Sequence, residues 1–228
     1  VCAIKGYKMI FVVPDKMSEE KINFLKAYGA NVIITKTAVS PDSPENYNVL
    51  AEKISKEIPN AFRPNQFANM ANPEIHYLTT GPEIWEDTKG KVDILVAGIG
   101  TGGSFTGISE VMKAKNPNFK SIAVEPVDSP VLSGGKAGPH KIQGIGAGFV
   151  PKVLNRDLID EIIQVKHEDA GEMARLLAKK EGILVGISSG ANLWAAIEVA
   201  KREENKGKTI LTIATDTGER YLSTWLFE

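Results

Sequence analysis

The sequence has only one cysteine, Cys2, among its 228 residues. A single cysteine excludes an internal disulfide and a cysteine-rich metal site, and it fits a reducing compartment. The sequence also has no apolar run close to the roughly 20 residues that span a bilayer, and no recognisable signal peptide. We therefore expect a cytoplasmic protein without membrane contact.

An excess of charge of one sign is missing as well. The 27 Lys and Arg residues and 28 Asp and Glu residues give a formal net charge of −1. This balance provides no general field to attract nucleic acid, so any anionic ligand must be held by local groups. No two of the three histidines, His76, His140 and His167, have metal-ligand spacing, and no metal site is predicted.

Short β-branched runs alternate with amphipathic helical patterns along the chain. Helices are expected after Ser18 as N-cap, and after Ser43 as N-cap with Pro44 at the first helical position. Strands are expected at "YKMIFVVP", "NVIIT", "VDILVAG", "SIAVEP" and "TILTIA". The alternation predicts an α/β fold with parallel-rich sheets and helices on both faces.

The chain starts without Met. Residues 1–6, "VCAIKG", have the pattern of the last turn of a helix that ends at Gly6. We therefore expect that a segment before Val1 is missing from this sequence.

A glycine-rich loop, "VAGIGTGGSFTG" (96–107), follows one expected strand. Its Gly-x-Gly-x-x-Gly spacing, with Glu125 about 20 residues further on, is typical of a dinucleotide site. A tight turn without a ligand is an alternative of similar weight. The third alternative is a phosphate monoester, because Thr101 and Ser104 add hydroxyls to the backbone N–H groups at a helix start. We favour the monoester, since a dianion needs more donors than a pyrophosphate.

A second motif, "VGISSGA" (185–191), has the Gly-x-Ser-x-Gly spacing of a hydrolase nucleophile. In such hydrolases the catalytic histidine follows the serine, whereas all histidines here precede Ser188. The hydrolase interpretation is therefore disfavoured. We expect Ser188 at a strand-to-helix turn, with its hydroxyl pointing outward to another partner.

Five longer stretches carry a family resemblance. They are "PNQFANMANPEIHYLTTGPEIWEDT", "VAGIGTGGSFTG", "SGGKAGPHKIQGIGAGF", "VGISSGAN" and "DTGERYLST". In this order and over the whole chain they resemble the cysteine synthases (O-acetylserine sulfhydrylases), which are β-replacing pyridoxal-phosphate enzymes of fold type II. The resemblance implies pyridoxal 5'-phosphate as cofactor. It makes residues 1–70 the remainder of a smaller N-terminal domain and 71–228 the larger cofactor-binding domain.

The resemblance also implies roles for single residues. Ser188 would meet the pyridine nitrogen, Gln66 would help to hold the substrate carboxylate, and Gly144 would lie in the loop beside the cofactor. Ser104 stands where the family usually has Thr. The residues expected to bind the cofactor phosphate are Gly100, Thr101, Gly102, Gly103 and Ser104.

Serine at position 188 is consistent with β-replacement. A serine hydroxyl bonds to a ring nitrogen but, unlike an aspartate, does not stabilise the protonated ring. The ring is then a milder electron sink, which favours loss of the β-leaving group over transamination. The reaction implied is L-cysteine biosynthesis from O-acetylserine and sulfide through an aminoacrylate intermediate, catalysed by a transferase.

Two parts of the family pattern do not occur in these 228 residues. They are the lysine that forms the Schiff base and a Ser-Gly-Asn-Thr-Gly loop for the substrate carboxylate, both carried by the family before the region where this chain begins. We therefore assign no catalytic residue and expect a truncated chain that does not turn over by itself.

Alternatives remain open. The stretch "SPDSPENY" (40–47) also resembles cystathionine β-synthases, which condense with homocysteine, whereas "GPEIWEDT" (81–88) favours cysteine synthase. An NAD-dependent oxidoreductase leaves Ser188 and Gln66 without a role, and an inactive cofactor-binding homologue is the non-enzyme alternative. The resemblance suggests a homodimer, with serine acetyltransferase as a candidate partner and no nucleic acid or membrane.

Overall fold

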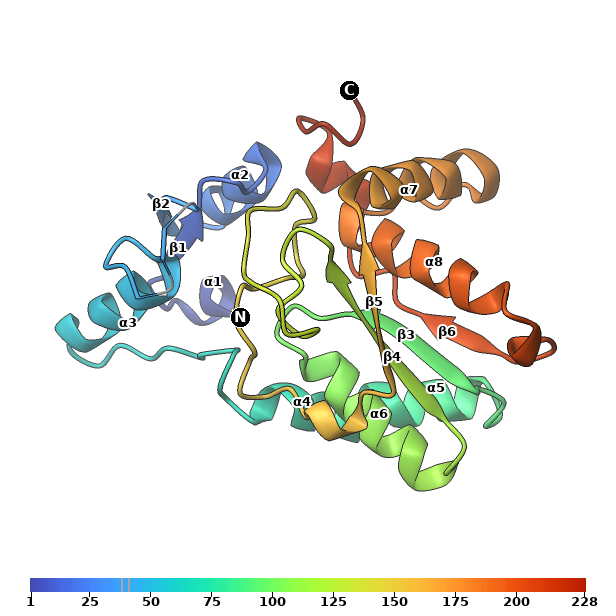
Figure 1. Ribbon diagram of the computed structural model, residues 1–228. Helices are drawn as coiled ribbons and strands as arrows, with labels where there is room; N and C mark the ends of the chain where they lie inside the picture. The colour runs from blue at the N-terminus through green and yellow to red at the C-terminus, as the bar shows by residue number, and fades with distance from the viewer. Residues whose placement is uncertain (38, 41) are drawn as a thin grey trace. The chain divides into compact units, whose positions relative to one another are not determined.

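The computed structural model describes residues 1–37, 39–40 and 42–228. Pro41 of the stretch 40–47 therefore lies outside the described residues. The chain divides into two compact units, one of Val1–Pro64 with Glu219–Glu228 and one of Asn65–Gly218. Each unit has its own parallel sheet (Figure 1). The assignment of 1–70 and 71–228 to the domains of the family stays a prediction.

The first unit is built on a two-stranded sheet. Strands β1 and β2 run parallel, with Ile10 opposite Asn31. Within the described part of 1–64, no hydrophobic side chain is buried. The elements are α1 (Cys2–Lys5), β1 (Ile10–Pro14), α2 (Glu19–Ala27), β2 (Asn31–Thr35) and α3 (Tyr47–Glu57). A 3₁₀ turn, η4 (Gly218–Tyr221), crosses the boundary between the units.

The helix starts of this unit differ in part from the sequence prediction. Ser18 is the N-cap of α2, but its hydroxyl donates to the Arg220 carbonyl at 2.6 Å and caps no α2 N–H group. The predicted start of α3 at Ser43 and Pro44 is wrong, because the N-cap is Asn46. The Ser43 hydroxyl accepts from the Glu45 N–H group instead, in a local turn that competes with the helix.

The second unit contains a four-stranded sheet with strand order β5-β4-β3-β6, all parallel. Strand β5 is not among the strands predicted from the sequence. The elements are α4 (Ala71–Ile75), the π-helix η1 (His76–Thr80), α5 (Gly81–Asp87), β3 (Ile94–Gly98), α6 (Gly103–Lys115), β4 (Lys120–Pro126), η2 (Arg156–Leu158), β5 (Glu161–Val165), α7 (His167–Glu181), α8 (Ile187–Ala200), η3 (Glu203–Asn205) and β6 (Ile210–Thr212).

Helices cover both faces of this sheet. The step from β3 to β4 and the step from β5 to β6 move across the sheet in opposite directions. Because parallel crossovers are right-handed, α6 and the α7–α8 pair fall on opposite faces, as Figure 1 shows. The structure thus confirms the predicted α/β class.

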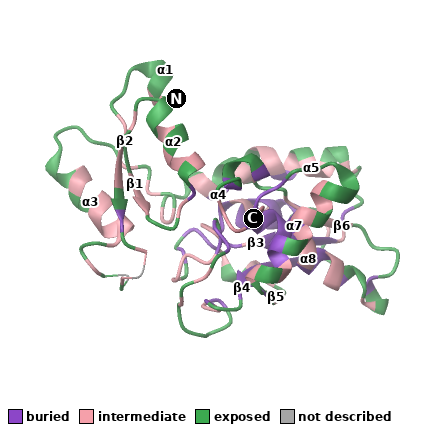
Figure 2. Cartoon of the chain, turned by 90° about the horizontal axis from the view of Figure 1, so that it is seen from above, coloured by how far each residue is buried: buried purple, intermediate pink, exposed green. Residues whose placement is uncertain are grey.

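The main hydrophobic cluster lies in this second unit. Strand β3 is its centre, with Leu95 and Val96 fully buried, and Phe105 and Ile108 of α6 pack there without exposure. Figure 2 shows the buried residues gathered around this sheet and α8. No helix in the described part of the chain is long and apolar enough to cross a membrane.

This arrangement brings several loops to one edge of the sheet. The segments after β3, β4 and β6 leave from the carboxyl ends of parallel strands. The N-terminus of α8 lies at the same edge, because Ser188 in its first turn contacts Thr215, which follows β6. Ligands of open α/β sheets bind at this edge, which makes it the candidate site.

Candidate functional site

The glycine-rich loop joins β3 to α6 at this edge. Gly102 precedes the helix with a φ of 85°, a left-handed conformation that glycine adopts without strain. The first N–H groups of the 13-residue helix have no partner within the helix and carry its positive dipole end. The hydroxyl of Ser104, in the same turn, has no hydrogen-bond partner among the residues that the structure describes. Apart from the Gly103 N–H group, which donates to the Thr101 hydroxyl at 3.3 Å, these groups are available to an anion.

Asn72 ties the segment of Gln66 to this loop. Its side-chain nitrogen donates to the backbone carbonyl of Gln66 at 2.8 Å and to the Thr101 hydroxyl at 2.9 Å. A Cβ on Gly103 would overlap the same amide group. Sequence reasoning missed Asn72 as a site residue, although it lies within the motif at 64–88 that carries the family resemblance.

The loop that carries Gly144 reaches the glycine-rich loop and α8. A Cβ on Gly100 would overlap the Gly144 carbonyl oxygen, so the two backbones touch. Gly144 has a φ of 101°, and a Cβ there would lie 3.4 Å from the Ser188 hydroxyl oxygen. The Gly146 N–H group also donates to the Ile99 carbonyl at 3.0 Å. The predicted residues Gly100, Gly144 and Ser188 are therefore neighbours.

Ser188 is the second residue of α8, after Gly186 as N-cap. The prediction of an outward hydroxyl after a strand is wrong on both points. Ser188 is only 4% exposed, and its hydroxyl lies 2.9 Å from that of Thr215. The preceding residues form an isolated antiparallel bridge, Val185 to Thr217, and no strand. The long-range contact with Thr215, 27 residues later, decides where this hydroxyl lies.

Glu125 argues against the dinucleotide interpretation. At 2% exposure, its carboxylate accepts from the backbone N–H groups of Leu132 at 2.8 Å and Ser133 at 3.1 Å, and from the Ser133 hydroxyl. Both oxygens are thus committed to the loop after β4, whereas a dinucleotide site needs a carboxylate for the ribose hydroxyls. Glu125 holds the segment that leads towards Gly144.

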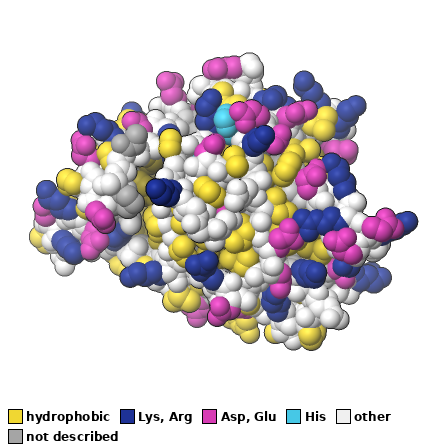
Figure 3. All heavy atoms as spheres, in the orientation of Figure 1, with side chains coloured by type: hydrophobic (Ala, Val, Ile, Leu, Met, Phe, Trp, Pro, Cys, Tyr) yellow, Lys and Arg dark blue, Asp and Glu magenta, His cyan; other side chains and the backbone are white. Residues whose placement is uncertain are grey.

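The side chains that surround the glycine-rich loop are uncharged, and the one buried carboxylate nearby, that of Glu125, is already hydrogen-bonded to Leu132 and Ser133. Hydroxyls, amides and backbone N–H groups surround the loop, and on the face shown in Figure 3 basic and acidic side chains are interspersed. An anion would therefore be held by the helix terminus and neutral donors. Among the described residues, no group of three His, Cys, Asp or Glu side chains could hold a metal ion.

Comparisons with known proteins agree with one another. Residues 1–216 match the family model described as "Pyridoxal-phosphate dependent enzyme". The cysteine synthase of Staphylococcus aureus strain Mu50 is 51% identical over 229 residues, which is 100% of this chain and 72% of that protein. The similarity thus extends over all residues of this chain, which correspond to 72% of that protein.

Solved structures show the same similarity. A crystal structure of cysteine synthase (OASS) from Entamoeba histolytica has a TM-score of 0.90 and 44% identity, covering 99% of this chain and 66% of that one. A hydrogen sulfide-producing enzyme from Fusobacterium nucleatum has a TM-score of 0.91 and 45% identity, covering 97% of this chain and 74% of that one.

Proposed function

This chain belongs to the family of pyridoxal-phosphate-dependent enzymes, among relatives that are cysteine synthases, and from this premise we propose its reaction and site. The cofactor of the family is pyridoxal 5'-phosphate. The proposed reaction is β-replacement, in which sulfide displaces acetate from O-acetylserine to give L-cysteine. The observation that carries the proposal is the 51% identity to a cysteine synthase along the whole chain.

The residues of the candidate site fit the cofactor. We assign its phosphate to the loop Gly100–Ser104, because the start of α6 offers N–H groups and the Ser104 hydroxyl has no other partner in the described chain. We assign its ring nitrogen to Ser188, and Gly144 to the loop beside it. Gln66, whose backbone is held near Thr101 by Asn72, is assigned to the substrate carboxylate.

The chemistry divides between cofactor and chain. When bound, pyridoxal phosphate supplies the electron sink that weakens bonds at the substrate α-carbon. Ser188 offers a neutral hydroxyl to the ring nitrogen and holds no counter-charge for a protonated ring. The helix start and the neutral donors orient the phosphate. This combination favours departure of the β-substituent.

A second candidate activity is sulfide release from cysteine. One similar structure, with 45% identity, is named a hydrogen sulfide-producing enzyme. Condensation with homocysteine and dinucleotide-dependent redox chemistry receive no comparable support, and the engaged carboxylate of Glu125 disfavours the latter. Both sulfide reactions would use the same cofactor site.

We also propose a homodimer in the cytoplasm, with serine acetyltransferase as a further partner. Support for self-association comes from apolar side chains around α4, where Met70, Ile75 and Leu78 are 60%, 52% and 61% exposed. Light scattering coupled to size-exclusion chromatography should give a particle mass that is twice the mass of one chain. A monomer at micromolar concentration would contradict the dimer.

The proposal is tested first by ligand binding. Equilibrium dialysis of the purified chain should show saturable binding of pyridoxal 5'-phosphate, weaker binding of pyridoxal, which lacks the phosphate, and no binding of NAD. Preference for NAD would overturn the assignment of the loop.

The reaction is tested separately on the protein expressed from its complete reading frame. Cysteine formation from O-acetylserine and sulfide is compared with sulfide release from cysteine. Faster sulfide release would favour the second candidate, and absence of both reactions would contradict the proposed activity.

A further inference from the structure

The hydroxyl groups of Ser188, Thr215 and Ser189 form a hydrogen-bonded network next to Gly144. The Ser188 oxygen lies 2.9 Å from the Thr215 oxygen, which lies 3.2 Å from the Ser189 oxygen. The Ser189 oxygen also accepts from the backbone N–H group of Thr215 at 2.9 Å. Ser188 and Ser189 are 4% and 3% exposed, whereas Thr215 is exposed.

The direction of each hydrogen bond in this network follows from counting donors and acceptors. Each hydroxyl donates one hydrogen and accepts through its lone pairs. The Thr215 N–H group already donates to Ser189, so the Ser189 hydrogen is free to point to the Thr215 oxygen. Thr215 can then donate to Ser188, and the Ser188 hydrogen is left to point away from the network.

The reverse order leaves a buried donor without an acceptor. If Ser188 donated to Thr215 and Thr215 to Ser189, the Ser189 hydrogen would need another acceptor, and its oxygen has no other partner in the described chain. A buried hydroxyl hydrogen without a partner is unfavourable. Because Thr215 is exposed, its hydrogen can also point to solvent, and an acceptor over Ser188 selects the first order.

We propose that Thr215 is a positioning residue that favours the arrangement in which the Ser188 hydroxyl donates to the cofactor's ring nitrogen, with Ser189 fixing the direction. The inference rests on the proposed function, because it takes the ring nitrogen as the partner of Ser188. Thr215 acts through Ser188 and touches no reacting atom. The site thereby favours a ring with an unprotonated nitrogen over a ring that lacks this hydrogen-bond acceptor.

The test uses a pair of ligands that differ only at the ring nitrogen. Equilibrium dialysis gives the dissociation constants of pyridoxal 5'-phosphate and of its 1-deaza analogue, in which C–H replaces the nitrogen. The ratio of the two constants reports the hydrogen bond from Ser188. For a neutral hydrogen bond the wild-type chain should favour the nitrogen ligand by about two- to tenfold.

Thr215→Val keeps the shape of the side chain and removes its hydroxyl, so the ratio should fall towards one. Thr215→Ser should restore the ratio, and Ser188→Ala should abolish it. Thr209→Val, at the opposite end of β6 and without a side-chain hydrogen bond in the described chain, is the matched control and should leave the ratio unchanged.

The outcomes separate the two proposals. No binding of pyridoxal phosphate by the wild-type chain overturns the proposed site and, with it, this inference. Binding without discrimination, or a wild-type ratio retained by Thr215→Val but lost in Ser188→Ala, overturns the role of Thr215. In the latter case Ser188 keeps its assignment.

Discussion

Single residues in the glycine-rich loop serve two separate purposes. Gly100 and Gly103 allow close packing, because a Cβ at these positions would overlap Gly144 and Asn72 respectively. The donors suited to a phosphate are the hydroxyl of Ser104 and the backbone N–H groups at the start of α6. Replacing either glycine would disturb both the packing of the loop and the binding of a phosphate. Replacing Ser104 with alanine removes only a hydrogen-bond donor.

Ser104→Ala should therefore weaken binding of pyridoxal 5'-phosphate by about ten- to one-hundredfold, the range for a hydrogen bond to a charged group. Binding of pyridoxal should not change. Ser109→Ala is the matched control on the same helix, since its hydroxyl is buried and has no partner in the described chain. Equal losses for pyridoxal and its phosphate would contradict the assignment of Ser104 to the phosphate.

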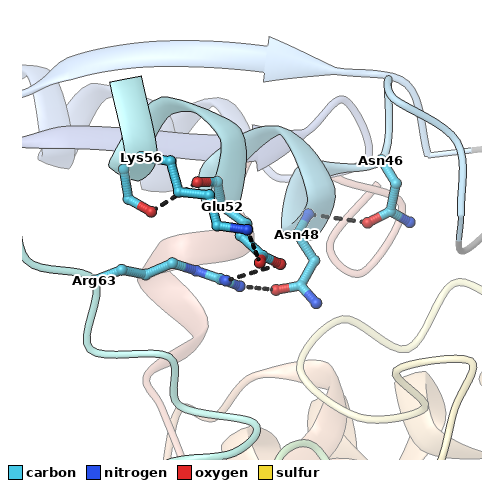
Figure 4. Close-up of polar contacts among 6 residues, drawn as sticks. Asn46, Asn48, Glu52, Lys56 and Arg63 are labelled. Carbon is cyan, nitrogen blue, oxygen red and sulfur yellow. Dashed lines mark hydrogen bonds and ion pairs between the residues drawn. The ribbon is translucent and has the colours of Figure 1, made fainter. Parts of the chain in front are cut away.

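At the scale of an element, α3 shows how a polar network starts a helix. The side-chain oxygen of Asn46 accepts from the Asn48 N–H group at 2.9 Å. Figure 4 shows Arg63 reaching back to Asn48 and Glu52, while Glu52 pairs with Lys56 at 2.7 Å. The exposed ion pair contributes little, so the cap matters more.

Asn46→Ala should destabilise α3 by about 1 kcal/mol, because one N–H group loses its acceptor. Hydrogen exchange at the Asn48 amide should accelerate, and the loss of helix can be followed by circular dichroism. Asn46→Asp keeps the acceptor and should preserve most of the protection. Unchanged exchange in Asn46→Ala would show that Asn46 does not cap the helix.

At the scale of the whole molecule, the main hydrophobic cluster lies within residues 65–218, and an ion pair joins two segments of this unit that are distant in sequence. Arg202, just after α8, donates two hydrogen bonds of 2.7 Å to Glu161 at the start of β5. This hydrogen bonding lowers the pKa of Glu161 from its ordinary 4.5. Since the folded pKa lies below the unfolded one, the pair stabilises the fold above about pH 4.5 and loses its effect as pH falls through the folded pKa.

Glu161→Gln should therefore lower the free energy of unfolding at pH 7 by about 1 kcal/mol or less, because both side chains are about one third exposed. The difference from wild type should shrink below about pH 4.5. Glu203→Gln breaks a pair whose side chains are 81% and 90% exposed and should show no such trend. A difference for Glu161→Gln that is independent of pH would contradict the ion-pair explanation.

The sequence by itself determined the α/β class, the motifs of the site and the family, because hydrophobic periodicity, turn residues and long motifs are local properties of the chain. It did not reveal strand β5 or the helix cap at Asn46, where half-buried and polar residues gave weak signals.

Only the tertiary structure decided which distant groups meet. The parallel strand order brings the loop after β3, the start of α8 and the segment after β6 to one edge, and so places Thr215 against Ser188. It also commits Glu125 to the loop after β4 and joins Gln66 to Thr101 through Asn72. Such contacts depend on how strands pair across the sheet, which no local pattern specifies.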